Sequence, residues 1–405
     1  MRIAYISFEY PPDTAVGGIA TYVHQVSKMM KSRGHDVEVF CGSPNRSISE
    51  VFEGMLVHRI VSDVPGFPKD ILSVFQQRHQ QKNFDLIETP EYSGDGYEIK
   101  RRFPELPMVV KLHTPSYFIH ELNHFYLPAK KKIRYIVGGL LRGKIRDFYW
   151  KWRKQEADID FLTTKLANQI HTPSISLGDI VAKSWKIDRA DILNVPYPFI
   201  ANKQYLDVPI GSETNTFTYI GRLEIRKGIV ELIKAIPAIF EAVPESKFVV
   251  VGRTAQSPVP GLTMKQYVEQ ELKNYSTRIE FLEVTPDQIP GILARTDVCV
   301  FPSLWENFPN VCLEAMSAGR AIVGSKQGGM HDMLELPEAG ILIDPLQPKE
   351  ISDAVIKLLK NKETRARLGE TARNKVLSAY NTQVIGDLME KYYSQLIQLG
   401  PPLSK

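Results

Sequence analysis

The chain has 405 residues, of which 43% are hydrophobic and 24% are charged, and its formal net charge is +4. This composition argues against a disordered or fibrous protein, and the length predicts two domains, or three, that each bury a core. The cysteines Cys41, Cys299 and Cys312 are odd in number and lack CxxC spacing, which argues against a disulfide framework or a structural zinc site.

The chain opens with a short apolar run that stops at Glu9 and two prolines. A signal-peptide core and a membrane-spanning helix both need longer apolar runs. We therefore expect the protein to reside in the cytoplasm.

The first half of the chain alternates strand and helix patterns. RIAYISFEY is predicted as a strand, and the next sixteen residues or so place six apolar side chains on one helical face before Gly34: Ile19, Tyr22, Val23, Val26, Met29 and Met30. Further strands are predicted at DVEVFCG, MLVHRIV, FDLIET, PMVVKLHT, NQIHTPS and DILNVPY. Strands that alternate with helices predict a mostly parallel sheet covered on both faces.

Residues 129–155 hold an excess of positive charge. They contain ten Lys or Arg and one Asp, so this segment carries +9 in a chain whose total is +4. Apolar and aromatic residues interleave with the cations, which suits an anionic membrane surface. Two alternatives are an amphipathic helix packed on the first domain with a solvated basic face, and a site for an anionic acceptor. No nucleic-acid-binding module is recognisable, so no nucleic-acid partner is expected.

A second series of strands and helices begins after residues 194–215, which contain three prolines and no sustained periodicity. Strands are predicted at TFTYIG, KFVVVG, IEFLEV, DVCVFPS, AIVGSK and GILID, and final helices at about 348–361, 363–379 and 381–398. We predict an α/β protein with two doubly wound domains, residues 1–195 and 214–380, joined by a linker at 196–213. Parallel sheets of this kind bind ligands at the carboxyl ends of their strands, so two facing domains would hold a ligand in a cleft.

The stretch GRLEIRKG, residues 221–228, follows a predicted strand and opens a helix. Glycines at both ends allow tight turns, so Arg222 and Lys227 would converge with the helix amides on one place, as in a phosphate site. Two cations and a helix dipole would offset the charge of a diphosphate without a metal ion. A solvated basic loop explains the same spacing.

The stretch WENFPNVCLE contains Glu306 and Glu314, which are separated by seven residues. Glu306 ends the loop after a predicted strand, Pro309 suits the first helical position, and Glu314 would lie in the helix. A helix N-terminus between two carboxylates would bind a phosphate, with hydroxyl groups on either side, which is the layout of a sugar nucleotide. The alternative is that Glu306 caps the helix and Glu314 faces solvent.

Taken together, GGIATYV, GRLEIRKG and ENFPNVCLEAMSAGRAIVGSKQGG resemble the retaining glycosyltransferases of family 4 in their order and spacing, over nearly the whole chain. The last stretch is similar to the E-x7-E signature of that family and its downstream glycine pair. The resemblance implies the GT-B fold, in which two Rossmann-like domains face a cleft and the C-terminal helices, including 381–398, return toward the first domain.

The resemblance also implies roles for individual residues. Arg222 and Lys227 would bind the donor diphosphate, Glu306 would lie near the donor sugar and its anomeric carbon, and Glu314 would hold the ribose hydroxyls. The other implied donor contacts are Asn307, Phe308 and Asn310, Val284 at the base, Gly17 and Gly18 at the distal phosphate, and His113 near the sugar's hydroxymethyl group. Pro309 stands where glycine is common and removes one amide contact. Glu9 and residues 88–96 are weaker candidates for the acceptor side.

The implied reaction transfers a hexose such as glucose from a UDP-sugar to an acceptor hydroxyl with retention, without a metal ion or other cofactor. The product would be a polysaccharide, lipopolysaccharide or glycolipid, and a lipid-linked acceptor would agree with peripheral contact of residues 129–155 with the inner face of the cytoplasmic membrane. Alternatives are a sugar phosphorylase, a nucleotide-sugar epimerase, or a nucleotide-sugar-binding protein without activity. A Rossmann-type oxidoreductase is disfavoured because the glycine-rich stretches lack GxGxxG spacing.

Overall fold

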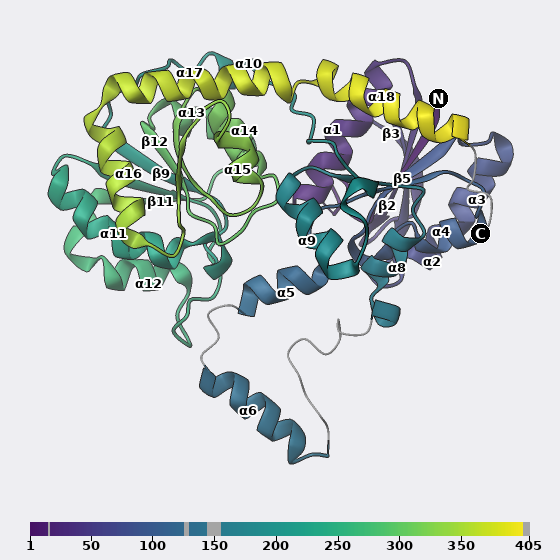
Figure 1. Cartoon of the computed structure of the whole chain (residues 1–405), viewed down its shortest axis with the longest axis horizontal. Coiled ribbons are helices and arrows are strands. Elements are labelled where there is room, and N and C mark those ends of the chain that lie inside the picture. Colours follow the sequence, from purple (N-terminus) through teal and green to yellow (C-terminus); the bar gives the residue numbers. More distant parts are fainter. Residues whose placement is uncertain (15–16, 125–128, 144–154, 400–405) are drawn as a thin grey trace. The chain divides into compact units, whose positions relative to one another are not determined.

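The computed structural model describes residues 1–14, 17–124, 129–143 and 155–399. As far as they are described, residues 1–121, 127–198 and 382–405 form one compact unit and residues 122–126 and 199–381 form another. We call these units the first and the second domain. Each is built on a largely parallel sheet with helices around it (Figure 1).

Among the described residues, the sheet of the first domain has eight strands in the order β3-β4-β2-β1-β5-β6-β7-β8. Neighbouring strands run parallel except β3 and β4, which are antiparallel. The strands are β1 (Arg2–Ile6), β2 (Asp36–Ser43), β3 (Ile48–Phe52), β4 (Met55–Val61), β5 (Leu86–Pro90), β6 (Met108–Lys111), β7 (Gln169–Thr172) and β8 (Ile192–Asn194). The strand order reverses between β1 and β5, which makes the carboxyl ends of these two strands the expected place for a ligand.

The helices of the first domain include the predicted amphipathic helix and the C-terminal one. They are α1 (Gly18–Ser32), α2 (Phe67–Asp70), α3 (Leu72–Gln81), α4 (Tyr97–Arg102), α5 (Ser116–His124), α6 (Ala129–Leu140), α8 (Ile159–Lys165), α9 (Ile175–Trp185) and α18 (Thr382–Leu399). An ion pair from Arg33 to Glu390 (2.8 Å) and a hydrogen bond between His35 and the same carboxylate (2.8 Å) attach α18 to the end of α1. The prediction that the C-terminal helix returns to the first domain is confirmed.

The sheet of the second domain has six parallel strands, within the described residues, in the order β11-β10-β9-β12-β13-β14. The strands are β9 (Thr216–Ile220), β10 (Lys247–Val251), β11 (Ile279–Leu282), β12 (Val298–Phe301), β13 (Ala321–Ser325) and β14 (Ile341–Ile343). This is the strand order of dinucleotide-binding folds, and it reverses between β9 and β12. The predicted α/β class with two parallel sheets is confirmed.

Helices surround the second sheet and supply much of its core. They are α10 (Lys203–Leu206), α11 (Ile229–Ala242), α12 (Met264–Glu271), α13 (Ile289–Ala294), α14 (Asn310–Ser317), α15 (Gly329–Leu334), α16 (Pro348–Lys360) and α17 (Lys362–Ala379). Helix α11 packs against α16, and α14 packs against α17. The core between them contains Phe217 and Phe248, whose rings stack with centroids 4.8 Å apart.

Gly228 brings the loops after β9 and β12 into direct contact at the point where the strand order reverses. It has φ of 75°, between the short 3-10 helix η4 (Ile225–Lys227) and α11. A Cβ atom on Gly228 would lie 1.6 Å from the carbonyl oxygen of Pro302, which is a backbone atom. The amide of Leu304 also donates to the carbonyl of Arg226 at 2.9 Å. The two loops therefore pack backbone against backbone, and only glycine fits at 228.

The substitution Gly228→Ala should destabilise the protein by more than about 1–3 kcal/mol, the cost of a strained backbone conformation alone, because the new Cβ also collides with Pro302. Urea denaturation measures the change. Gly291→Ala in α13 is the matched control, since no atom lies within 4 Å of its Cβ position and its φ is not positive. Equal urea midpoints for Gly228→Ala and Gly291→Ala would contradict the close packing of Gly228 against Pro302.

Glu38 on β2 is a buried carboxylate surrounded by cations. It accepts hydrogen bonds from Arg2 (2.6 Å), Arg78 (2.8 Å) and the ring of His58 (2.9 Å). Burial by itself raises the pKa of Glu38, but the hydrogen bonds from His58, Arg78 and Arg2 outweigh it and hold the pKa well below its usual value. The folded state therefore stabilises the charged form of Glu38 relative to the protonated form.

We expect this cluster to contribute stability above the unfolded-state pKa of about 4.3 and to lose it as the pH falls below that value. Glu38→Gln should cost about 3–5 kcal/mol at pH 7, because it removes the buried carboxylate that Arg2 and Arg78 share. Chemical denaturation at pH 7, 4 and 3.5 should show the difference from wild type shrinking once the pH falls below about 4.3. Glu280→Gln, which removes an exposed pair with Arg295, should change stability by less than about 1 kcal/mol. If the stability difference between Glu38→Gln and wild type stays constant over this pH range, the cluster does not hold the pKa of Glu38 below its usual value.

Candidate functional site

Lys227 and Glu306 meet where the strand order of the second domain reverses. Lys227 comes from the loop after β9 and Glu306 from the loop after β12, and the ammonium group of Lys227 contacts Oε1 of Glu306. The hydroxyl of Ser303 donates to the same oxygen at 3.0 Å. The structure thus brings together two of the predicted site residues. Ser303 was not predicted, although its place directly after a strand marks it as a residue at the ligand-binding edge.

The charges around Glu306 keep it ionised. Burial by itself raises its pKa, but the charges of Lys227 and Arg226 and the hydrogen bonds from Lys227 and Ser303 hold the pKa below its usual value. Glu306 is therefore a hydrogen-bond acceptor at neutral pH and has no proton to give.

Arg222 is oriented differently from Lys227. Its side chain is 61% exposed, and its Nε lies 3.2 Å from Oε1 of Glu224. The same carboxylate accepts hydrogen bonds from Arg226 at 3.2 and 3.3 Å. In this structure Arg222 therefore pairs with Glu224 and not with Glu306, the partner of Lys227. Glu224 contacts both arginines of this loop.

Helix α14 begins one residue later than predicted. Pro309 has φ of −73° and ψ of 121°, so it is the extended residue that precedes the helix, and Asn310 is the first helical residue. The placement of Pro309 in the first helical position is therefore wrong, because its ψ is not helical. No side-chain cap bond is recorded at this helix start, so the alternative that Glu306 caps α14 is not supported.

Glu314 lies in α14 and is partly buried, so it is not a fully solvent-facing glutamate. Burial raises its pKa to about 7. Its charge also contributes to the raised pKa of Tyr205, after burial of that tyrosine. A carboxyl group with this pKa changes charge near neutral pH and is well suited to accept hydrogen bonds from hydroxyl groups.

The remaining predicted residues of the second domain support the loop after β12 or lie near the end of β11. Asn307 and Phe308 are buried, and the ring of Phe308 packs edge-on against Tyr380 with centroids 5.2 Å apart. The amide of Gly329 donates to the carbonyl of Glu306 at 2.8 Å, which attaches the predicted glycine pair to the same loop. Val284 lies two residues beyond β11 and is partly buried.

Gly17 and Gly18 form the N-terminus of α1 in the first domain, as the cap and the first helical residue. A Cβ atom on Gly17 would lie 3.5 Å from a carboxylate oxygen of Glu9. Burial raises the pKa of Glu9, and the main chain of Ala20 and Gly17 offsets part of that rise. Glu9 therefore lies at the same helix end as the predicted glycine pair.

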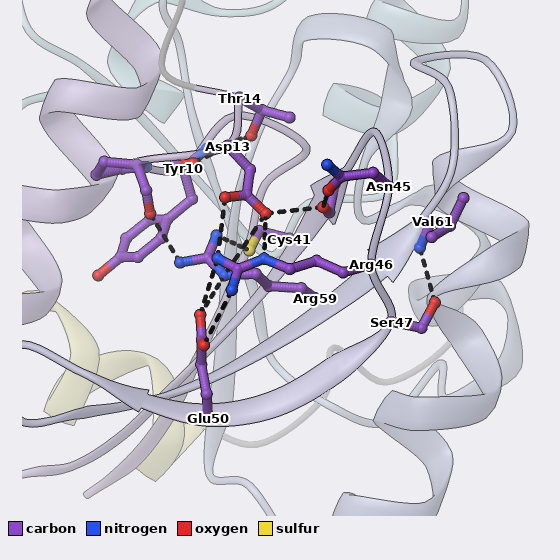
Figure 2. Close-up of polar contacts among 12 residues, drawn as sticks. Tyr10, Asp13, Thr14, Cys41, Asn45, Arg46, Ser47, Glu50, Arg59 and Val61 are labelled. Carbon is purple, nitrogen blue, oxygen red and sulfur yellow. Dashed lines mark hydrogen bonds and ion pairs between the residues drawn. The ribbon is translucent and has the colours of Figure 1, made fainter.

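A cluster of charged side chains holds residues 11–13, which follow β1 (Figure 2). Asp13 accepts two hydrogen bonds from Arg46, at 2.8 and 2.9 Å, and one from Ser43 at 2.7 Å. Arg59, which is fully buried, donates to the carbonyl of Pro11 at 2.8 Å and to Glu50 at 2.7 Å. The loop after β1 is thereby tied to β3, β4 and the segment after β2.

His113 lies two residues after β6 and is buried. Its amide donates to both carboxylate oxygens of Glu91, at 3.0 and 2.8 Å, and its Nδ1 lies 2.6 Å from the hydroxyl of Tyr197. Burial, and after it the charge of Lys111, lower the pKa of His113 to about 3. The imidazole is therefore neutral at physiological pH.

Buried carboxylates organise the loops at this edge of the first sheet. Asp160 accepts from the amides of Ser93 (3.0 Å) and Ser116 (2.7 Å), and Asp95 accepts from Phe8 (2.7 Å). None of these roles was predicted, although residues 88–96 were noted as candidates. Among the residues that the structure describes, no group of three His, Cys, Asp or Glu is placed to hold a metal ion.

Two family descriptions match this chain. Residues 16–197 match the model described as Glycosyltransferase Family 4, and residues 206–375 match Glycosyl transferases group 1. The D-inositol 3-phosphate glycosyltransferase of Corynebacterium jeikeium (strain K411) is 23% identical to the chain and covers 99% of it, with 98% of that enzyme covered.

Solved structures share the fold at low sequence identity. Sucrose-phosphate synthase from Thermosynechococcus elongatus superimposes with a TM-score of 0.72 at 19% identity, covering 98% of this chain and all of that one. Anabaena HepE in complex with UDP-glucose gives a TM-score of 0.67 at 17% identity, with 98% and 100% covered. The strand orders, the matched families and these structures agree, and the chain therefore belongs to the family 4 glycosyltransferases and has the GT-B fold.

Proposed function

We propose that this glycosyltransferase moves a hexose, glucose in the first instance, from a UDP-sugar to an acceptor hydroxyl with retention at the anomeric carbon and without a metal ion. The acceptor is a sugar, an oligosaccharide or a lipid-linked glycan in polysaccharide, lipopolysaccharide or glycolipid synthesis. The observation that carries the proposal is the contact of Lys227 with Glu306 where the strand order reverses. The structure of HepE with UDP-glucose supports the choice of donor.

The chemistry assigned to the second domain is electrostatic. Lys227, which Glu306 keeps in place, and Arg222, which is exposed and pairs with Glu224, would bind the diphosphate and stabilise the charge that develops on it as the sugar departs. Glu314 would accept hydrogen bonds from ribose hydroxyls. Glu306 would accept them from the donor sugar, and its low pKa agrees with an acceptor role. No covalent intermediate on Glu306 is proposed.

Lys227→Ala should lower kcat by about 10²- to 10³-fold, because removal of one donor that stabilises a developing anion typically costs about 2.7–4 kcal/mol. Arg222→Ala should have an effect of the same order. The measurement is nucleotide release from a panel of UDP-, GDP- and ADP-sugars, followed by mass spectrometry. Lys234→Ala is the control, since this exposed lysine of α11 pairs only with Glu231 among the recorded ion pairs of the described residues.

Three outcomes of this assay would count against the proposal. Release of sugar phosphate only when inorganic phosphate is present would indicate a phosphorylase, and interconversion of two nucleotide sugars without an acceptor would indicate an epimerase. Binding of UDP-glucose without turnover, with or without acceptor sugars, would indicate a binding protein.

We also propose that the protein contacts an anionic membrane surface through the segment that contains α6. Five apolar side chains in this helix and in the residue directly after it are exposed: Ile133 (59%), Ile136 (40%), Val137 (44%), Leu140 (59%) and Leu141 (82%). Their spacing places them on one face of the helix, and Arg134 and Arg142 are exposed beside them. Residues 144–154 of the predicted basic segment lie outside the described residues. None of the helices of the described part is long and apolar enough to span a bilayer.

An apolar helical face flanked by cations suits the interface of an anionic bilayer, where each cation contributes about 1 kcal/mol. The protein should therefore pellet with vesicles of phosphatidylglycerol and phosphatidylcholine at low salt, and much less with phosphatidylcholine alone. Arg134→Glu with Arg142→Glu should weaken partitioning by at least about 2 kcal/mol, roughly thirtyfold. Ile133→Asp with Leu140→Asp should abolish pelleting.

Val51→Asp is the control, because Val51 is 73% exposed on β3, far from α6 in the sequence. If neither added salt nor Arg134→Glu with Arg142→Glu reduces pelleting, electrostatic attachment is ruled out. Failure of the wild-type protein to pellet would rule out membrane contact altogether.

A further inference from the structure

Hydrogen bonds hold His113 in place at its main-chain amide and at its ring. Its main-chain amide donates to both oxygens of Glu91, which is fully buried. Its ring is contacted by Tyr197 through a 2.6 Å hydrogen bond at Nδ1. One contact places the backbone and the other fixes the rotation of the imidazole.

Two tyrosine rings enclose the imidazole. The ring of Tyr22 lies edge-on to it with centroids 5.2 Å apart, and the ring of Tyr197 lies at 5.5 Å. The hydroxyl of Tyr197 contacts the imidazole, whereas the hydroxyl of Tyr22 donates to Glu88 at 2.6 Å. The ammonium group of Lys111 lies 5.1 and 5.3 Å from the centres of the two tyrosine rings and donates to the carbonyl of Val195.

A neutral imidazole has one nitrogen that donates and one that accepts, and the partner of one nitrogen fixes the role of the other. A phenol hydroxyl donates more readily than it accepts. The short contact at Nδ1 is therefore best satisfied when Tyr197 supplies the proton. The ring proton of His113 is then carried by Nε2.

We propose that Tyr197 is a positioning residue whose hydroxyl donates to Nδ1 of His113 and thereby fixes His113 as the tautomer that donates from Nε2. This inference rests on the proposed function only for the target of that donor, which is a hydroxyl oxygen of the donor sugar. Burial keeps His113 neutral, so the same tautomer would be present throughout the pH range in which the enzyme works.

The test is nuclear magnetic resonance of the full-length protein labelled with ¹⁵N-histidine, in which two-bond correlations identify the protonated nitrogen of each ring. His113→Gln assigns the signal. In the wild type at pH 7 we expect Nε2 to be protonated and Nδ1 to show the shift of a nitrogen that accepts a hydrogen bond. In Tyr197→Phe the Nδ1 signal should move toward the value of a nitrogen without a hydrogen bond.

Tyr22→Phe is the matched control. It also removes one hydroxyl from a tyrosine packed on His113, but that hydroxyl is bonded to Glu88, so the His113 signals should keep the wild-type pattern. A protonated Nδ1 in the wild type would overturn the inference, whether or not the variants fold. An Nδ1 signal that Tyr197→Phe leaves in place would also overturn it.

Kinetics separates this inference from the proposed function. With the donor that the nucleotide-sugar panel identifies, Tyr197→Phe should lower kcat by about tenfold, the equivalent of one well-placed hydrogen bond, with a smaller change in KM. Tyr22→Phe should not share this loss. An unchanged kcat in Tyr197→Phe, despite the altered Nδ1 signal, would overturn the positioning role. If no nucleotide sugar is turned over, the proposed function fails, while the tautomer is still decided by the spectra.

Discussion

The contact between Lys227 and Glu306 is the interaction on which the site of the second domain depends. It joins the loops after β9 and β12, which flank the reversal of strand order, and both side chains are largely withdrawn from water. Because a charge left unpaired in such a place is costly, each partner holds the other where it is. The close approach of Gly228 to Pro302 supports the same alignment through the backbone.

The first domain organises its loops by a different means. Carboxylates of Glu91, Asp95 and Asp160 accept hydrogen bonds from main-chain amides that follow β1, β5 and β6. Burial raises the pKa of Glu91 to about 8, with the charge of Asp160 adding to the effect. Burial of these carboxyl groups is unfavourable in free energy, and their hydrogen bonds with the main-chain amides offset part of that penalty. His113 owes its defined position to this arrangement and to Tyr197.

The two domains therefore present different kinds of side chains at their strand ends. The second domain groups three cations: Arg222 and Arg226 pair with Glu224, and Lys227 pairs with Glu306. The first domain presents a neutral histidine and the glycine-rich start of α1. Cations suit a diphosphate, whereas neutral donors suit sugar hydroxyls, and this division agrees with a glycosyltransferase that binds a charged nucleotide sugar.

The sequence by itself determined the α/β class, the strands of both sheets apart from β3, the three final helices and the membership of family 4. These features follow from periodicity and from motifs in which neighbouring residues act together. Strand β3 was missed because its residues are mostly exposed at a sheet edge, so no apolar pattern marks it. Only the tertiary structure decided that Lys227 pairs with Glu306 while Arg222 pairs with Glu224, and that Tyr197 contacts His113. Lys227 and Glu306 lie 79 residues apart, and Tyr197 and His113 lie 84 residues apart, so these contacts depend on how loops from different strands meet, which no local spacing in the chain contains. Arg222 and Glu224 share one loop, and the folded conformation of that loop brings them together.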